Sequence, residues 1–546
     1  MSGALPIRQQ RIGQISARGG SQIAAGIFYG NVQFGNIEDS RKGAFEQAAS
    51  ACRNALFLTD PYTDRESIRS AKGVRVTGTC EWIAYNDSYC DWLDGNTRLL
   101  WISGGPGKGK TMLSVFLTEQ LEQKVSSMAD TRLIFYFFNG QDEKRNTAVA
   151  MLRGLVHQII TERPQLVKHA LSHFETPKRA QQTTSSLETL WIIFSRLIED
   201  PGIGTMFCVI DGLDECNEDE RKTLVPRIVS LLSSKTPSSA TQTFKMVLVS
   251  REMRGLRDCA TMKLDPDNNE NVASDIERFV STRVESLSKM EGFDDGLRAY
   301  VRNTLLMRAE GTFLWAGFAV NELSQKETSS EVLELLEDLP SGLPAIYSRM
   351  LLQIPTDRRR TSCSILQWVT MSMRPLSLEE LAAAVGVHSS SLLTAEQAIR
   401  DEVALCGPFL KVQEREVVLV HQSARDYLLR KGSDSNSVLE GFRINPETAH
   451  FKLAQACLDC VACSGLQHAL VDLEDKSCPE SPLLRYAVLH WPEHAKQCSA
   501  LAASLFSLSK PIFQKNSTLR KYWWATHHRI IGKMDESSLP PLLHME

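Results

Sequence analysis

The sequence predicts an α/β domain in which a parallel sheet lies between two layers of helices, followed by domains that are mainly helical. Short apolar runs alternate with amphipathic helical patterns between residues 99 and 250, as in parallel sheets that helices cover on both faces. After about Leu264 the strand patterns largely stop, and helical periodicity continues to about residue 530 with one short pair of strands in between. Open parallel sheets bind ligands at the carboxyl ends of their strands, so the functional site is expected there.

The first predicted strand, residues 99–102, runs into a glycine-rich turn and then into a helix. The turn reads G-x-x-x-x-G-K-T over residues 104–111. Glycines let backbone N–H groups converge on a phosphate without Cβ clashes, and the helix start adds the positive end of its dipole. The alternative is a chance glycine-rich turn. The predicted nucleotide-binding residues are Gly104, Gly105, Pro106, Gly107, Lys108, Gly109, Lys110, Thr111 and Met112.

Two of these residues have predicted roles beyond the loop backbone. Lys110 is expected to reach the β- and γ-phosphates of the nucleotide, and the Thr111 hydroxyl is expected to hold Mg²⁺. Contacts to the phosphates do not distinguish one nucleotide base from another. ATP or ADP is the expected ligand, and GTP is the alternative.

An apolar run at 206–210 ends in an acidic turn, 211–215, with the sequence DGLDE. Asp211 is predicted to bind Mg²⁺ through water, and Asp214 and Glu215 to orient or deprotonate the attacking water. An acidic turn after a strand is common by itself. Together with the phosphate loop about 100 residues upstream, it predicts a P-loop NTPase.

Two further strands are predicted at 132–138 and 245–249, and the second of these ends in Ser250 and Arg251. An arginine at the carboxyl end of a strand faces the crevice where open α/β sheets bind ligands. Arg251 is therefore a candidate sensor of the γ-phosphate, and a surface cation is the alternative.

The composition excludes several classes of function. The 546 residues are 42% hydrophobic and 23% charged, and the net charge of −4 supplies no basic field for nucleic acid. No apolar run reaches the ~18 residues of a membrane span. The 13 cysteines are scattered and no secretory signal precedes them, so reduced thiols and a cytoplasmic location are expected.

The N-terminal segment differs from the rest of the chain, because residues 19–37 carry no charge at all. The segment mixes Gly, Asn and Gln with aromatic and β-branched residues. It has three interpretations: a disordered tail, an arginine-rich transit peptide, and a self-templating segment that stacks as cross-β structure.

The later part of the chain contains a pattern typical of a winged helix. Ser377 precedes Glu380 by three residues, as in a capping box, and short strands are predicted at 409–412 and 416–420. Winged helices often bind DNA, but residues 377–385 are acidic and apolar, which argues against a DNA contact. His421 closes the second strand, where a structural role and a role at the nucleotide are both open.

Six segments are expected. They are a disordered tail (1–42), a helical linker (43–96), the nucleotide-binding domain (97–265), a helical domain (266–345), a winged-helix domain (346–432) and a C-terminal helical domain (433–546).

With these motifs in place, the sequence resembles the NACHT-domain NTPases of the STAND class, in their fungal NOD-like-receptor form. The resemblance covers roughly residues 43–530. Its strongest marks are GGPGKGKT at 104–111 and VIDGLDEC at 209–216. Other segments that resemble the family are LTDPYTDRESI (58–68), TCEWI (79–83), AEGTFLWAGFAV (309–320), RPLSLEEL (374–381) and VHQSARDYL (420–428).

The resemblance implies a slow NTPase that serves a signalling switch. Arg251 falls where the family has its sensor arginine, and His421 falls where related receptors place a histidine on the β-phosphate of ADP. The resemblance further implies that exchange of ADP for ATP would open the protein and that open protomers would assemble into a homo-oligomeric ring. The proline that often touches the nucleotide has no counterpart, since GTFLW stands at 311–315.

The N-terminal stretch GGSQIAAGIFYGNVQFGN resembles the amyloid signalling motifs that precede fungal NACHT domains. Such motifs template an effector protein, often one that causes cell death, so an effector partner is implied. The sensor repeats usual in the family are missing, which suggests a short natural form or a truncated gene product. Rival functions are a remodelling ATPase and a scaffold that binds nucleotide only for stability.

Overall fold

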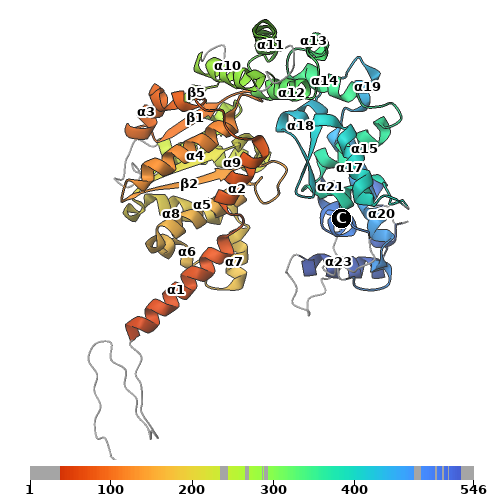
Figure 1. The fold of residues 1–546 in the computed structure, drawn as a ribbon. Coiled ribbons are helices and arrows are strands. Elements are labelled where there is room, and N and C mark those ends of the chain that lie inside the picture. Colours follow the sequence, from red (N-terminus) through yellow and green to blue (C-terminus); the bar gives the residue numbers. More distant parts are fainter. Residues whose placement is uncertain are drawn as a thin grey trace, which may run out of the picture.

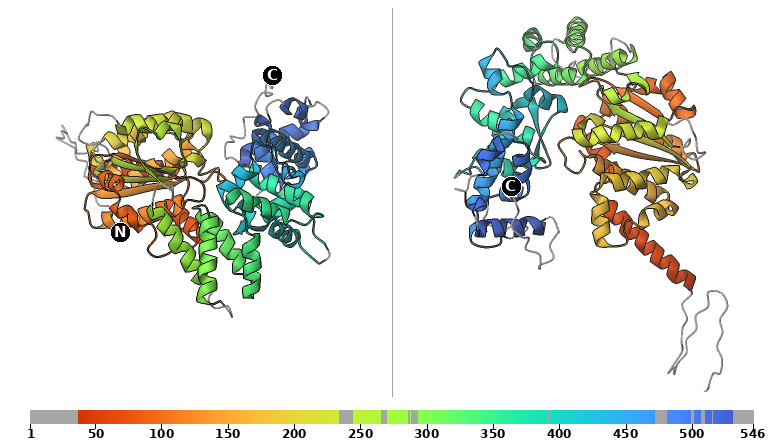
Figure 2. Two further views of the ribbon diagram at one scale, coloured as in Figure 1. Left: turned by 90° about the horizontal axis from the view of Figure 1, so that it is seen from above. Right: turned by 180° about the vertical axis from the view of Figure 1, so that it is seen from behind.

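The computed structural model describes residues 37–233, 244–264, 270–285, 287, 293–390, 392–471, 481–498, 501–506, 510–514 and 516–530. The described chain forms two lobes, joined by a layer of helices (Figure 1). The sheet lobe contains β1 to β5, and the helical lobe contains α15 to α23. Two further views show the same arrangement, with α10 to α14 between the lobes (Figure 2).

The sheet lobe has a parallel five-stranded sheet in the order β2-β3-β4-β1-β5. Every residue of β1 and β4 is buried, as expected for central parallel strands. The sequence predicted four of the strands. It did not predict the fifth, which is short and half exposed. The strands are β1 (Leu99–Ser103), β2 (Thr131–Phe137), β3 (Thr205–Asp211), β4 (Phe244–Ser250) and β5 (Ala260–Lys263).

Helices cover both faces of this sheet, which confirms the predicted three layers. Alternate side chains of β2 belong to two separate cores, with Phe135 and Phe137 in one and Tyr136 in the other. The helices of the lobe are α1 (Ile37–Leu56), α2 (Pro61–Lys72), α3 (Asp87–Asp94), α4 (Lys110–Ser126), α5 (Ala148–Glu162), α6 (Lys168–Leu171), α7 (Pro177–Thr184), α8 (Leu187–Glu199) and α9 (Glu218–Ser233).

Two expectations for the N-terminal part need correction. Helix α1 begins at Ile37, inside the segment predicted as a tail, because charged residues return from Glu38 onward. The linker predicted as helical is interrupted before α3 by a 3₁₀ turn, Glu81–Tyr85. Asn86 ends the turn and caps α3 by accepting a hydrogen bond from the Tyr89 N–H. Apart from residue 37, the segment predicted as amyloid-like lies outside the described residues.

Among the described residues, the helices that connect the lobes are α10 (Glu270–Glu285), α11 (Asp295–Arg308), α12 (Phe313–Leu323), α13 (Ser329–Asp338) and α14 (Leu343–Leu352). In the helical lobe an antiparallel sheet of order β6-β8-β7 confirms the winged helix. Its elements are α15 (Arg359–Met371), β6 (Leu376–Ser377), α16 (Leu378–Val385), α17 (Ala395–Leu405), β7 (Leu410–Gln413), β8 (Glu416–Leu419), α18 (Gln422–Leu428) and α19 (Ser437–Gly441).

The expected capping box at the start of α16 is present. Ser377 Oγ accepts from the Glu380 N–H at 3.1 Å, and Glu380 Oε2 accepts from the Ser377 N–H at 2.9 Å. The two-residue strand β6, which was not predicted, leads directly into this cap.

The last part of the chain is helical. It contains α20 (Pro446–Ala462), α21 (Leu484–Lys496), α22 (Ala502–Leu505) and α23 (Thr518–Ile530). The Tyr486 hydroxyl accepts a hydrogen bond from the Met373 N–H at 3.0 Å, which fixes this part against the winged helix. Among the helices that the structure describes, none combines the length and the apolar character that a bilayer crossing demands.

Candidate functional site

The phosphate loop connects the end of β1 to the start of α4. Gly107 and Gly109 have φ of 73° and 82°, values that L side chains rarely adopt. Gly109 is also the N-cap of α4, and no side chain caps this helix start. The N–H groups of the first turn of α4 are thus available to an anion, as the motif predicted.

Lys110 is half-buried at the start of α4, and its ammonium binds backbone carbonyl groups. Its Nζ donates to the carbonyl oxygens of Gly104 and Gly105, each at 2.8 Å. Burial lowers the pKa of Lys110, and within the described residues no carboxylate forms an ion pair with its ammonium. A half-buried cation that hydrogen-bonds to carbonyl groups fits an anionic phosphate as a further partner.

A segment from the connecting helices covers the outer side of the loop. The Phe313 N–H donates to the Gly107 carbonyl at 2.9 Å, and Lys108 Nζ donates to the Glu310 carbonyl at 3.0 Å. The predicted phosphate residue Lys108 therefore directs its side chain toward the connecting helices. Pro106 lies in the same loop and Met112 in the first turn of α4.

The two predicted metal ligands lie against each other. The Thr111 hydroxyl hydrogen-bonds to the Asp211 carboxyl at the end of β3. Ser114, which the sequence analysis missed, donates to Asp211 Oδ1 at 2.7 Å from the next turn of α4. Burial raises the pKa of Asp211, and the Ser114 and Thr111 hydrogen bonds oppose that rise. A buried carboxylate beside a threonine hydroxyl fits Mg²⁺, whose other ligands would be phosphate oxygens and water.

The acidic turn after β3 places its two carboxylates in different surroundings. Glu215 Oε2 accepts a hydrogen bond from the Gly140 N–H at 2.9 Å. Burial raises the pKa of Glu215 to about 7, with Asp214 and Asp211 adding to the rise. Asp214 instead binds Arg251, accepting from its backbone N–H at 3.0 Å and lying 3.1 Å from its Nε. Glu215 is thus the carboxylate of the turn that remains available as a base.

Arg251 joins the two lobes. Its Nη1 lies 2.5 Å from Oδ2 of Asp426, which belongs to α18 of the helical lobe. One guanidinium therefore contacts a carboxylate from each lobe. Asp426 was not predicted from the sequence, because one acid in a short helix carries no motif.

His421 lies beside this ion-pair chain as the N-cap of α18. Its Nδ1 accepts a hydrogen bond from the Ser423 N–H at 3.1 Å, which leaves the ring proton on Nε2. Burial, together with the nearby cations Lys72, Lys110 and Arg251, lowers the pKa of His421 to about 3. The ring is thus neutral at pH 7.

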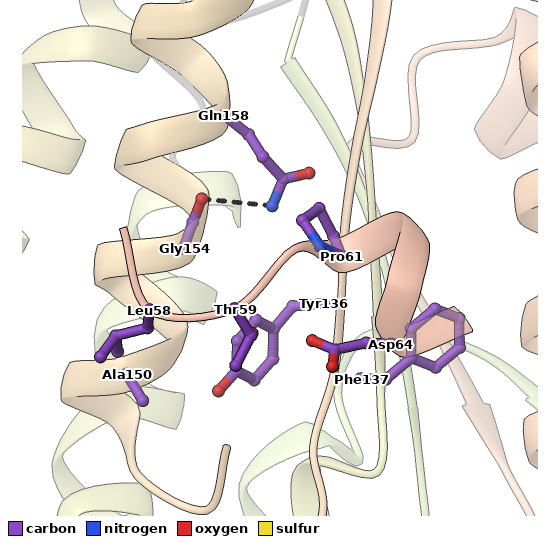
Figure 3. A pocket seen from close by; sticks show the side chains of 9 residues that line it. All are labelled: Leu58, Thr59, Pro61, Asp64, Tyr136, Phe137, Ala150, Gly154 and Gln158. Carbon is purple, nitrogen blue, oxygen red and sulfur yellow. Dashed lines mark hydrogen bonds between the residues drawn. The ribbon is translucent and has the colours of Figure 1, made fainter. Parts of the chain in front are cut away.

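Each of the following predicted site residues interacts with another of the set, through a hydrogen bond, an ion pair or an electrostatic effect on its pKa. They are Lys110, Thr111, Asp211, Asp214, Glu215, Arg251 and His421. A separate small cavity lies between α2, α5 and the β2 edge of the sheet (Figure 3). Tyr136 and Asp64 line this cavity. It is three strands away from β1, so it does not belong to the candidate site.

Two known families match separate parts of the chain, one in the sheet lobe and one in the helical lobe. Residues 78–251 match the family described as nephrocystin 3, N-terminal, and residues 348–440 match the winged helix domain of GPI inositol-deacylase. The first match contains the phosphate loop, the acidic turn and Arg251. The second contains His421 and Asp426.

Among curated proteins, vegetative incompatibility protein HET-E-1 of Podospora anserina is 32% identical over 399 residues. The chain is thus similar to this fungal protein over most of its own length. The match covers 71% of this chain but only 28% of HET-E-1, so the chain spans little more than a quarter of that relative. The family matches and the identity together confirm the resemblance to fungal NACHT proteins.

The solved structures that are similar to this protein share little sequence with it. A STAND protein with a tetratricopeptide repeat sensor from Pyrococcus horikoshii has a TM-score of 0.34 at 11% identity, covering 82% of this chain and 56% of that one. A Walker-type ATPase of Pyrococcus abyssi has a TM-score of 0.31 at 11% identity, covering 65% of this chain and 97% of that one. At these values the similarities carry no information on function.

Proposed function

We propose that the chain is a nucleotide-dependent signalling switch, in which ADP with Mg²⁺ keeps the two lobes together and ATP separates them. The ion-pair chain through Arg251 carries this proposal. Its guanidinium binds Asp214 of the sheet lobe and Asp426 of the helical lobe at the place where the phosphates would lie.

Residues from both lobes would hold the nucleotide. The backbone of residues 104–109 and the Lys110 ammonium would bind the phosphates, and Thr111 with Asp211 would hold Mg²⁺. When bound, Mg²⁺ neutralises charge on the phosphate oxygens. His421 would donate its Nε2–H to the β-phosphate, because its Nδ1 is already engaged by Ser423.

The proposed switch follows from competition for Arg251. A γ-phosphate carries more negative charge than one carboxylate, so it would attract the guanidinium away from Asp426. A ligand shifts a two-state equilibrium only by its different affinity for the two states, and this competition supplies such a difference. Hydrolysis would restore the closed form, with Glu215 accepting the proton of the attacking water.

The proposal also includes a signalling step that follows opening of the protein. Open protomers would self-associate in the cytoplasm and bring their N-terminal segments together, which raises the local concentration that cross-β assembly needs. An effector with a matching segment would then be templated. The name of the relative HET-E-1 supports a role in vegetative incompatibility, and cell death is the proposed output.

The test is the mass of the purified chain in solution with ADP, with ATP, and without nucleotide. The Glu215→Gln variant should remain a monomer with ADP and form oligomers with ATP. The double variant that also carries Lys110→Ala should stay monomeric in both. Fast turnover of ATP by the wild type with no change in mass would instead indicate a remodelling ATPase, and an unchanged mass without turnover would indicate a scaffold.

A further inference from the structure

Helix α2 brings a lysine to the candidate site from outside the known motifs. Arg65 Nη1 lies 2.8 Å from Glu122 Oε2, and Arg69 Nη1 lies 3.8 Å from Glu119 Oε1. Residue numbers rise along α2 as they fall along α4, so the two helices are antiparallel. The last residue of α2, Lys72, therefore lies toward the start of α4, where the phosphate loop ends.

The distances along the helices are compatible with this approach. A helix rises 1.5 Å per residue, so Thr111 lies about 12 Å along α4 from Glu119. Lys72 lies about 4.5 Å beyond Arg69 along α2, and its four-carbon side chain spans most of the remainder. Gly73 caps α2, its N–H donating to the Arg69 carbonyl, and ends the helix there.

Three groups from separate elements locate the Lys72 ammonium independently. Burial is the largest influence on the pKa of Asp211, Glu215 and His421, and Lys72 lowers the pKa of all three. For Asp211 and His421, its effect ranks above that of Lys110. The ammonium thus acts electrostatically on the end of β3, the acidic turn and the N-cap of α18 at once.

Lys72 also lacks a fixed partner of its own. It is exposed, and no ion pair or hydrogen bond within the described parts of the chain holds its ammonium. Arg69, one turn earlier, lies near both Glu66 and Glu119. A cation near the candidate site without an ion pair of its own fits an anion bound there.

We propose that the Lys72 ammonium binds the terminal phosphate of a nucleoside triphosphate held by the phosphate loop, and so discriminates the triphosphate from the diphosphate. This inference rests on the proposed nucleotide binding and adds a specificity-determining residue to it. The diphosphate would be held by Lys110 and the loop backbone, whereas only the triphosphate would extend to the end of α2.

The test compares dissociation constants for ADP and for a non-hydrolysable ATP analogue, each with Mg²⁺, by titration calorimetry. Lys72→Gln should weaken binding of the analogue about tenfold, as expected for one lost hydrogen bond to a charged group, and leave ADP within twofold. Lys72→Arg should restore most of the difference. Arg69→Gln on the same helix is the matched control and should change neither constant.

The outcomes separate this inference from the proposed function. If the wild type binds both nucleotides and Lys72→Gln weakens neither, or weakens both equally, the assignment of Lys72 to the terminal phosphate is wrong. If the wild type binds neither nucleotide, the proposed function fails and the assignment fails with it.

Discussion

Replacing Asp426 with asparagine tests whether Arg251 holds the two lobes together. The change keeps the size of the side chain and removes the charge that Arg251 Nη1 meets at 2.5 Å. The bond from Arg251 to Asp214 stays, so the sheet lobe keeps its own contacts. The variant should therefore shift the balance toward the open form and leave the fold intact.

The expected size of the shift follows from the exposure of the pair. The side chains of Arg251 and Asp426 are 27% and 43% exposed, so water screens part of their attraction. Ion pairs of this kind contribute up to about 1 kcal/mol. A loss of about 1 kcal/mol from the closed form corresponds to about a fivefold change in the equilibrium between closed and open forms.

The assay is the rate of ADP release from the purified protein, followed with a fluorescent ADP analogue. Asp426→Asn should release the analogue about five times faster than the wild type. Glu402→Gln is the matched control, because Glu402 pairs with Arg358 at 2.6 Å within the helical lobe. Equal release rates for Asp426→Asn and Glu402→Gln would refute the role given to the inter-lobe pair.

Three further predictions concern Glu215 and Gly107 of the sheet lobe. Glu215→Gln should lower single-turnover ATP hydrolysis about a hundredfold, because an amide cannot accept the proton of water; an unchanged rate of phosphate release would exclude Glu215 as the base. Burial raises the pKa of Glu215 from 4.5 to about 7, so the stability it contributes is present below about pH 4.5 and is lost as the pH rises through about 7. Denaturant unfolding of the nucleotide-free wild type should show this decline relative to Glu215→Gln, and parallel pH curves would count against it. Gly107→Ala should lower the free energy of unfolding by about 1–2 kcal/mol, since φ is +73° and the new Cβ would lie 3.2 Å from Leu314 Cβ. Gly317→Ala, with nothing within 4 Å, should be neutral or stabilising, so a similar loss of melting temperature in both would contradict the argument.

Local sequence patterns were sufficient for most of the sheet lobe. The apolar run before the phosphate loop predicted β1 within one residue of its observed end, because a continuous apolar run is what a fully buried strand requires. The strand β5 was missed because its four residues are partly exposed and resemble a loop. The two residues of β6 are too few to show any alternation.

Local sequence patterns likewise predicted some residues of the candidate site and not others. Asp211 is the last residue of the buried strand β3, and Asp214 and Glu215 follow it, so their position in the fold could be predicted from the sequence. Asp426 and Lys72 lie in helices whose charges look like those of any exposed helix. Arg251 and Asp426 are 175 residues apart, and their contact depends on how the two lobes pack, which no local pattern records. The domain boundaries and the roles of the individual site residues stay predictions.

The nucleotide carried by the purified chain, measured together with its mass for the wild type and for Lys110→Ala, tests the central claim most directly. The account predicts a monomer that retains ADP, and it predicts that the variant loses the nucleotide because the Lys110 ammonium no longer meets the phosphates. A wild type that carries no nucleotide, or a Lys110→Ala variant that carries as much ADP as the wild type, would contradict it.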